Sequence, residues 1–85
     1  MSYVHYIKGT DIKVRISKNN IYTQAVKTSY RGMVKYTCHH SLIDVSNHIN
    51  KVRGEYNRHP QDFNADYNPN EQGFFQVFPL EVKVI

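Results

Sequence analysis

The first chemistry that this sequence offers is the neutralisation of anionic groups. Between residues 11 and 37, lysines and arginines alternate with apolar residues, and tyrosines lie among them. Cationic side chains neutralise phosphates, and this interaction dominates affinity for nucleic acids whatever their sequence. Aromatic rings add a surface on which unpaired bases stack. The candidate nucleic-acid-binding residues are therefore Lys13, Arg15, Lys18, Tyr22, Arg31 and Lys35, extended by Lys51, Arg53 and Arg58.

The distribution of charge supports an anionic partner. The net charge of the 85 residues is +4, but it is not spread evenly. Residues 1–37 contain seven lysines and arginines against the single acid Asp11, whereas residues 59–85 contain four acids and only Lys83. A basic first part and a mildly acidic last part favour an anionic partner for the first part.

Single-stranded RNA is the expected ligand, because its unpaired bases can be splayed out and stacked on exposed rings. Five of the seven tyrosines lie in the basic part, although some of them are expected to belong to the core. The sequence contains no RNP signature, no Gly-X-X-Gly clamp and no zinc-finger spacing. A domain that lays a sheet into the major groove of DNA is one alternative. A protein-docking inhibitor without nucleic acid is the other.

The histidines offer two further chemistries, and we favour neither. Cys38, His39, His40 and His48 match no standard zinc spacing, so no metal and no cofactor is expected. A metal-independent ribonuclease would need a general acid, a general base and cations near the phosphate. Adjacent residues of an extended segment point opposite ways, so His39 and His40 cannot easily serve one site. We expect no enzymatic activity.

The elements that must position these side chains begin with strands. Residues 3–8 are rich in aromatic and β-branched residues, and residues 12–17 alternate strictly between apolar and polar. Asn19-Asn20 predicts a two-residue hairpin turn in which Lys18 pairs with Ile21, so that residues 13–18 pair with residues 21–26. The inner face would then carry Ile12, Val14, Ile16, Thr23 and Ala25, and the outer face Lys13, Arg15, Ser17, Tyr22 and Gln24, with Val26 as an apolar exception. Residues 33–38 continue this meander and place Lys35 on the side of Arg15.

The periodicity then changes to that of a helix. Ser41 is a typical N-cap, and Pro60 ends the segment. One apolar stripe follows at spacings of three and four: Leu42, Val45, Ile49, Val52 and Tyr56. Residues 57–73 form a long polar loop, which Phe63 and Tyr67 either pin to the body or leave free for contacts. Pro79 places the final apolar run at an edge, a bulge or a break between two short strands.

These elements predict one small α+β domain over residues 1–85, in the order β-β-β-β-α-loop-β, with the helix on one face of an antiparallel sheet. A chain of this length has a modest core, so a homodimer would complete it. The single cysteine favours a reducing, cytoplasmic setting. The first residues lack the apolar run of a signal peptide, and no segment has the ~20 apolar residues of a membrane span.

In size and composition the chain resembles the small tyrosine- and asparagine-rich accessory proteins of T4-like phages. The basic run KVRISKNNIYTQAVKTSYRGMVK, residues 13–35, is similar in character to what an RNA-dependent inhibitor of a bacterial ribonuclease toxin, of the TifA type, would use. The resemblance implies a non-enzymatic inhibitor that acts through bound RNA in the host cytoplasm. It rests on overall character, so no functional residue is transferred from it.

Overall fold

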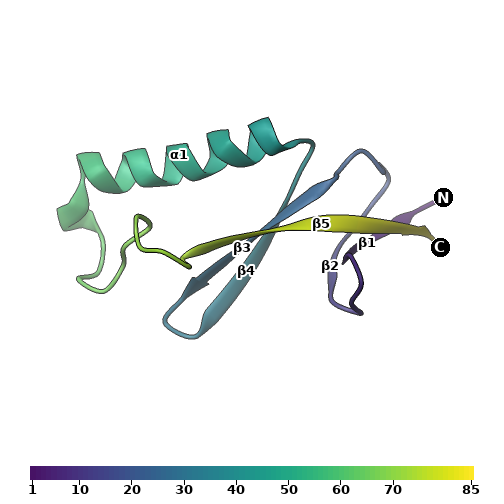
Figure 1. The fold of residues 1–85 in the computed structure, drawn as a ribbon, viewed down its shortest axis with the longest axis horizontal. Coiled ribbons are helices and arrows are strands. Elements are labelled where there is room, and N and C mark those ends of the chain that lie inside the picture. Colours follow the sequence, from purple (N-terminus) through teal and green to yellow (C-terminus); the bar gives the residue numbers. More distant parts are fainter.

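Five antiparallel strands and one helix make up the computed structural model, which describes all residues from 1 to 85 (Figure 1). The elements in chain order are β1 (Tyr3–Ile7), β2 (Lys13–Ser17), β3 (Gln24–Tyr30), β4 (Met33–His39), α1 (Leu42–Arg58), a 3₁₀ turn (Pro60–Asp62) and β5 (Phe75–Val84). The sheet has the strand order β2-β1-β5-β3-β4. The predicted α+β class, the order of elements and the helix packed on one face of the sheet are confirmed.

β5 is the central strand, and it changes partner along its length. Residues 75–79 pair with β3, and residues 80–84 pair with β1. Pro79 lies at the change, where its carbonyl accepts from the Lys8 amide at 3.0 Å and the next amide, of Leu80, donates to Thr23 at 3.0 Å. The expectation that Pro79 marks an edge or interrupts the strand is therefore wrong. Proline has no N–H to donate, but none is needed here, because the strand pairing of β5 changes from β3 to β1 between Pro79 and Leu80.

The predicted hairpin between β2 and β3 is also wrong. β2 pairs with β1 after a turn at Gly9, whose φ of 79° suits glycine. Residues 18–23 instead lead to β3, which is separated from β2 in the sheet by β1 and β5. The predicted faces fail with the hairpin: Ile12 and Ile16 are 45% and 52% exposed, whereas Val26, expected to point outward, is completely buried. The alternation in the sequence identified β2 but not its partner.

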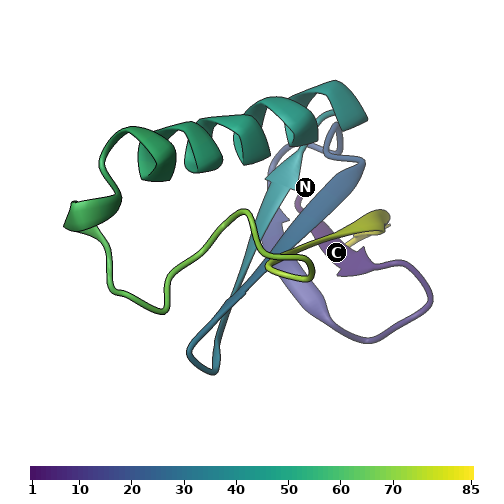
Figure 2. The ribbon, with the colours of Figure 1, turned by 60° about the vertical axis from the view of Figure 1, so that its left-hand side comes forward.

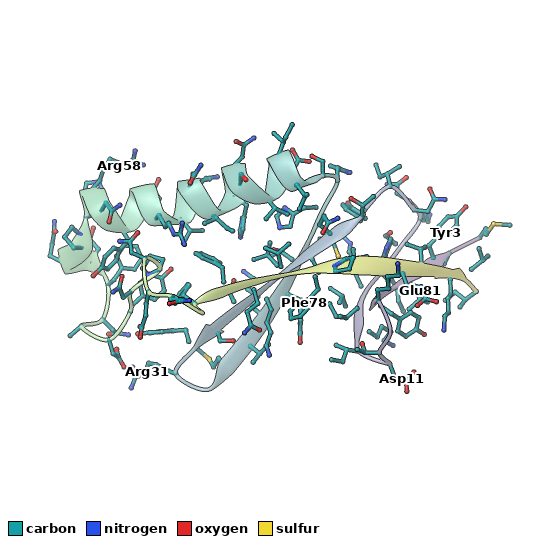
Figure 3. The ribbon with its side chains drawn as sticks, viewed as in Figure 1. Tyr3, Asp11, Arg31, Arg58, Phe78 and Glu81 are labelled. Atoms are coloured by element: carbon teal, nitrogen blue, oxygen red, sulfur yellow. The ribbon has the colours of Figure 1, made fainter.

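The β3–β4 hairpin is closed by a two-residue turn at Arg31-Gly32. Tyr30 pairs with Met33, and the two turn residues have φ values of 52° and 77°. Positive φ at both positions is the type I′ geometry that matches the twist of the flanking strands. The turn places the Arg31 side chain at the tip of the hairpin, at the left of Figure 3.

α1 begins at the predicted cap and lies on β3 and β4. The Ser41 hydroxyl accepts from the Asp44 amide at 3.2 Å, which satisfies one of the free amides of the first turn. Val45 is buried, and the other stripe residues further along the helix are half-buried. Leu42, the first residue of the predicted stripe, is 63% exposed, so the stripe does not pack on the sheet at its first residue. The helix therefore uses only part of its apolar face.

The segment between α1 and β5 is held by aromatic rings. Phe63 stacks on Tyr67 with ring centroids 4.8 Å apart, and Tyr67 meets Phe74 edge-on at 5.2 Å. Tyr56 of α1 lies 5.6 Å from Phe63. In Figure 2 this segment leaves the end of the helix and returns to the sheet. Of the two roles predicted for Phe63 and Tyr67, pinning the loop to the body is the one observed.

The molecule is elongated, with a core divided along β5. Its extents are 44 × 25 × 19 Å and its radius of gyration is 14.2 Å, compared with about 12 Å for a compact domain of this length. Its accessible surface of 5866 Å² exceeds the value of about 5200 Å² expected for this mass. We call β3, β4, α1 and residues 59–79 the helix-covered half, and β1, β2 and residues 80–84 the open half.

Candidate nucleic-acid interface

The first group of predicted cations lies on β2 and on the residue that follows it. Lys13, Arg15 and Lys18 are all exposed and take part in no ion pair. The Arg15 guanidinium lies 4.9 Å from the centre of the Tyr22 ring. His40 stacks on the same ring at 4.9 Å, so a base would have to displace a neighbour to stack on Tyr22. This group would therefore bind a ligand through its positive charge and not through stacking on Tyr22.

Lys35 does not share a face with Arg15, contrary to the prediction. Arg15 pairs with His5, and this register continues through Val82. Side chains of even number in β5 point to one face and those of odd number to the other. Lys35 pairs with Thr28, which pairs with the odd-numbered Phe75, so Lys35 points to the opposite face, beneath α1. The prediction failed because it assumed the β2–β3 hairpin.

The three predicted arginines of the helix-covered half are engaged within the protein. Arg31 forms an ion pair with Asp66 at 3.5 Å, and Arg58 forms one with Glu55 at 3.0 Å. Both arginines lie at the end of the molecule furthest from the termini (Figure 3). The Arg53 Nε donates to the Pro69 carbonyl at 3.0 Å. These arginines stabilise the loop and the helix end, which leaves Lys35 and Lys51 as the predicted cations without a partner here.

Lys35 lines a hollow between α1 and the sheet, which sequence reasoning did not find. The hollow has a volume of about 190 Å³, is partly open to solvent, and is lined by Thr28, Lys35, Thr37, His48, Val52, Tyr67 and Phe75. No hydrogen bond within the protein engages the side chains of Thr28, Lys35 or His48, although the neighbouring Thr37 is bonded to His39 at 2.7 Å. Because pairing between β3 and β5 assembles the hollow, no local pattern could have revealed it.

The electrostatics of the hollow favour an anion. Burial lowers the pKa of His48, and the positive charges of Lys35 and Lys51 lower it further. The pKa of His39 is lowered by burial and then by His48, although Asp44 acts in the opposite direction. Both imidazoles are therefore predominantly neutral at neutral pH, and the two lysines supply the positive charge.

The histidines do not form an acid–base pair around an open site. His39 and His48 lie with ring centroids 4.8 Å apart, so they contact each other and leave no room for a phosphate between them. His40 points away from both, toward Tyr22. No group of three or more His, Cys, Asp or Glu side chains is arranged to hold a metal ion. Burial raises the pKa of the Cys38 thiol, which keeps it protonated.

His5 is a second feature that the sequence did not reveal. It is completely buried on β1, where its Nε2 lies 3.0 Å from the Ser17 hydroxyl and 3.1 Å from the Asn19 carbonyl. Its Nδ1 has no hydrogen-bond partner. The Ser17 hydroxyl also donates to the Asn19 carbonyl at 2.6 Å. These contacts hold the start of the 18–23 crossing against β1 and so position Lys18.

No protein-family model, curated protein or solved structure matches the chain. The helix α1 is too short and too polar to cross a membrane.

Proposed function

We propose that the protein is a small, non-enzymatic, cytoplasmic protein that binds single-stranded RNA. The observation that carries this proposal is the hollow of the helix-covered half, where Lys35 lines the same space as the aromatic residues Tyr67 and Phe75, and Lys51 lies close enough to His48 to lower its pKa. Cations beside aromatic rings suit a ligand made of phosphates and unpaired bases. Of the eleven lysines and arginines, only Arg31 and Arg58 form ion pairs, so most of the positive charge is free to meet a polyanion.

A flexible strand can reach both groups of cations. β4 is an edge strand, so an RNA bound at Lys35 can pass around this edge to the other face. The other face carries Arg15, which shares the Tyr22 ring with His40, the residue that follows β4. A single strand is flexible enough to follow this path, whereas a duplex is too stiff to bend so tightly. This arrangement favours RNA over a DNA duplex held in the major groove.

The test is the ratio of absorbance at 260 nm to that at 280 nm for freshly purified protein, before and after nuclease and a high-salt wash. We expect a high ratio that falls with ribonuclease and is unchanged by deoxyribonuclease. A fall with deoxyribonuclease alone would support the DNA alternative. A protein-like ratio throughout, with no binding to added RNA oligonucleotides, would contradict the proposal.

The resemblance to RNA-dependent phage inhibitors extends the proposal to biology. In that setting the bound RNA would bridge the protein to a nucleic-acid-handling host protein such as a ribonuclease toxin. Association with such a toxin should then require RNA and disappear when ribonuclease removes it. Association that survives complete digestion would mean direct contact between the two proteins.

Protein docking is the second candidate function, and exposed apolar residues favour it. Leu42 and Ile43 at the start of α1 are 63% and 73% exposed. Apolar residues of this size gathered at one place are typical of contact surfaces. A homodimer that forms through Leu42 and Ile43 is a prediction. Sedimentation of the wild-type protein and of a Leu42→Ser, Ile43→Ser double variant tests it. Self-association that this variant abolishes would support a contact surface, and a monomer at all concentrations would exclude the dimer.

A further inference from the structure

The hollow beneath α1 is built from side chains that three strands bring into one row. Lys35 of β4 pairs with Thr28 of β3, which pairs in turn with Phe75 of β5. These three side chains point to the same face, and α1 closes the space above them with His48 and Val52, which lie four residues apart and hence on one side of the helix. Six of the seven lining residues therefore lie on regular elements, and the seventh, Tyr67, lies in the loop, where it stacks on Phe63.

The lining combines two kinds of side chain. The hydroxyl of Thr28, the ammonium of Lys35 and the imidazole of His48 have no hydrogen-bond partner within the protein. Val52, Tyr67 and the half-buried ring of Phe75 supply apolar and aromatic surface, and His48 lies beside Phe75 with ring centroids 6.3 Å apart. A ligand that fits this combination has a flat apolar body, polar atoms at its edge and a negative charge nearby.

From this geometry we infer that the hollow binds one unpaired base of an RNA strand, with an adjacent phosphate held by Lys35 and Lys51. The inference rests on the proposed function, which it makes more specific. The base lies against Phe75, and its edge meets the Thr28 hydroxyl and the His48 imidazole. The phosphate stays outside the hollow, where Lys51 is exposed on α1.

The size of the hollow favours part of a polymer over a free small molecule. Its volume of about 190 Å³ is below the roughly 300–1,000 Å³ of sites that enclose a whole drug-sized ligand. A single base fits such a space, while the sugar and phosphates that follow it remain in solvent. Affinity for an isolated nucleotide is then weak, and most of the binding energy comes from charges along the strand.

The test compares two ligands, a fluorescent decamer of uridines and an abasic phosphodiester decamer of the same charge, by anisotropy at matched ionic strength. Stacking and edge contacts of one base predict that the wild-type protein binds the uridine decamer about 5- to 100-fold more tightly. The variant Thr28→Phe fills the hollow and should lose this preference while it still binds both decamers through charge. Val84→Phe adds the same ring to an exposed position of the open half and should retain the preference.

The outcomes separate the inference from the proposed function. A folded Thr28→Phe protein that keeps the preference would overturn the base site and leave RNA binding intact. Failure of the wild-type protein to bind either decamer would overturn both. If Thr28→Phe does not fold, Phe75→Leu replaces it: loss of the preference supports the base site, and retention of the preference overturns it. Amide NMR shifts on addition of the uridine decamer should be largest at Thr28, Lys35 and His48.

Discussion

The two halves of the molecule use their cationic side chains differently. In the helix-covered half, three arginines hold the loop and the helix end through Asp66, Glu55 and the Pro69 carbonyl. In the open half, none of the lysines or arginines forms an ion pair. The helix-covered half has a second layer above the sheet and with it a hollow, whereas the open half has no helix above it.

This difference separates two parts of recognition. An exposed surface with free lysines attracts a polyanion of any sequence, because the interaction is with phosphates. A hollow with fixed polar groups can distinguish one ligand from another. We therefore expect the open half to contribute affinity and the helix-covered half to contribute preference for a base.

The largest effect should come from the aromatic cluster that supports the hollow. Phe74 is buried against Tyr67, and its carbonyl accepts from the Ser29 amide at 3.1 Å. Phe74→Ala should lower the free energy of unfolding by about 3–5 kcal/mol, most of the stability of a domain this small. Val4→Ala in the open half should cost about 2 kcal/mol.

Urea unfolding followed by circular dichroism measures both variants. Because β5 belongs to both halves, each variant should unfold in a single transition. Two separate transitions would show that the halves are independent. A Phe74→Ala protein as stable as the wild type would contradict the role of the cluster.

The next largest effect concerns RNA affinity across the two faces. Arg15→Glu with Lys35→Glu should weaken RNA binding by about 100-fold or more, which corresponds to about 2.7 kcal/mol, without unfolding the domain, because both side chains are exposed. The dependence of log K on log salt should become shallower by about 0.7 for each phosphate that the protein no longer neutralises. Each single substitution reports on one half.

The control for this experiment is Arg58→Glu, because Arg58 is already paired with Glu55. We expect it to change affinity less than either Arg15→Glu or Lys35→Glu. Unchanged RNA binding by the folded double variant would exclude both residues from the interface. An effect of only one substitution would assign binding to the corresponding half.

A smaller effect should appear as the pH falls. The pKa values of His39 and His48 are lowered in the folded protein, so below the ordinary histidine value of about 6.5 the unfolded chain binds more protons than the folded one. The stability contributed by the neutral pair is present above that pH and is lost as the pH falls through the folded pKa values. The urea midpoint should therefore be lower at pH 5.5 than at pH 7.5.

The matched variants for the pH experiment are His48→Gln, which removes one member of the pair, and His59→Gln, which alters an exposed histidine beyond α1. The pH dependence should decrease in His48→Gln and remain in His59→Gln. Equal pH dependence in all three proteins would show that the pair does not control acid sensitivity.

The smallest effect should come from the ion pair between the hairpin tip and the loop. Arg31 and Asp66 have side chains that are 58% and 63% exposed, at a separation of 3.5 Å. Exposed pairs of this kind contribute about 0.2–1 kcal/mol. A double-mutant cycle with alanine at both positions, measured by urea unfolding, should give a coupling energy in this range that decreases with salt. A larger value would mean that the loop depends on this pair more than on its aromatic rings.

Local patterns in the sequence predicted the elements well but not their partners. The alternation of residues 12–17 and the cap at Ser41 identified β2 and α1 close to their observed bounds. The same alternation led to a wrong hairpin, because Asn19-Asn20 satisfies the rules for a turn whether or not the flanking strands pair. Insertion of β5 between β1 and β3 depends on contacts distant in sequence, which no local pattern encodes.

The residues of the candidate site were also predicted only in part. Lys35 and Lys51 were identified from charge; Lys35 lines the hollow, and the charge of Lys51 lowers the pKa of the lining residue His48. Arg53 was identified in the same way, but its guanidinium is held by Pro69 and lies 5.7 Å from the centre of the Phe75 ring. Thr28 and Phe75 were not identified, because neither residue type suggests binding until the register brings the two together.

The shared strand β5 has a consequence for how the chain folds. β1 cannot complete its strand pairing until residues 80–84 of β5 are in place, and β3 cannot complete its own until residues 75–79 of β5 are in place. Most of the backbone must therefore lose its conformational freedom before the strand pairs with β5 form. Because these pairs join residues that are distant in sequence, we expect slow folding for a protein of this length. Until β5 is in place, β1 and β3 both present unpaired edges, so the partly folded chain is the species most exposed to aggregation.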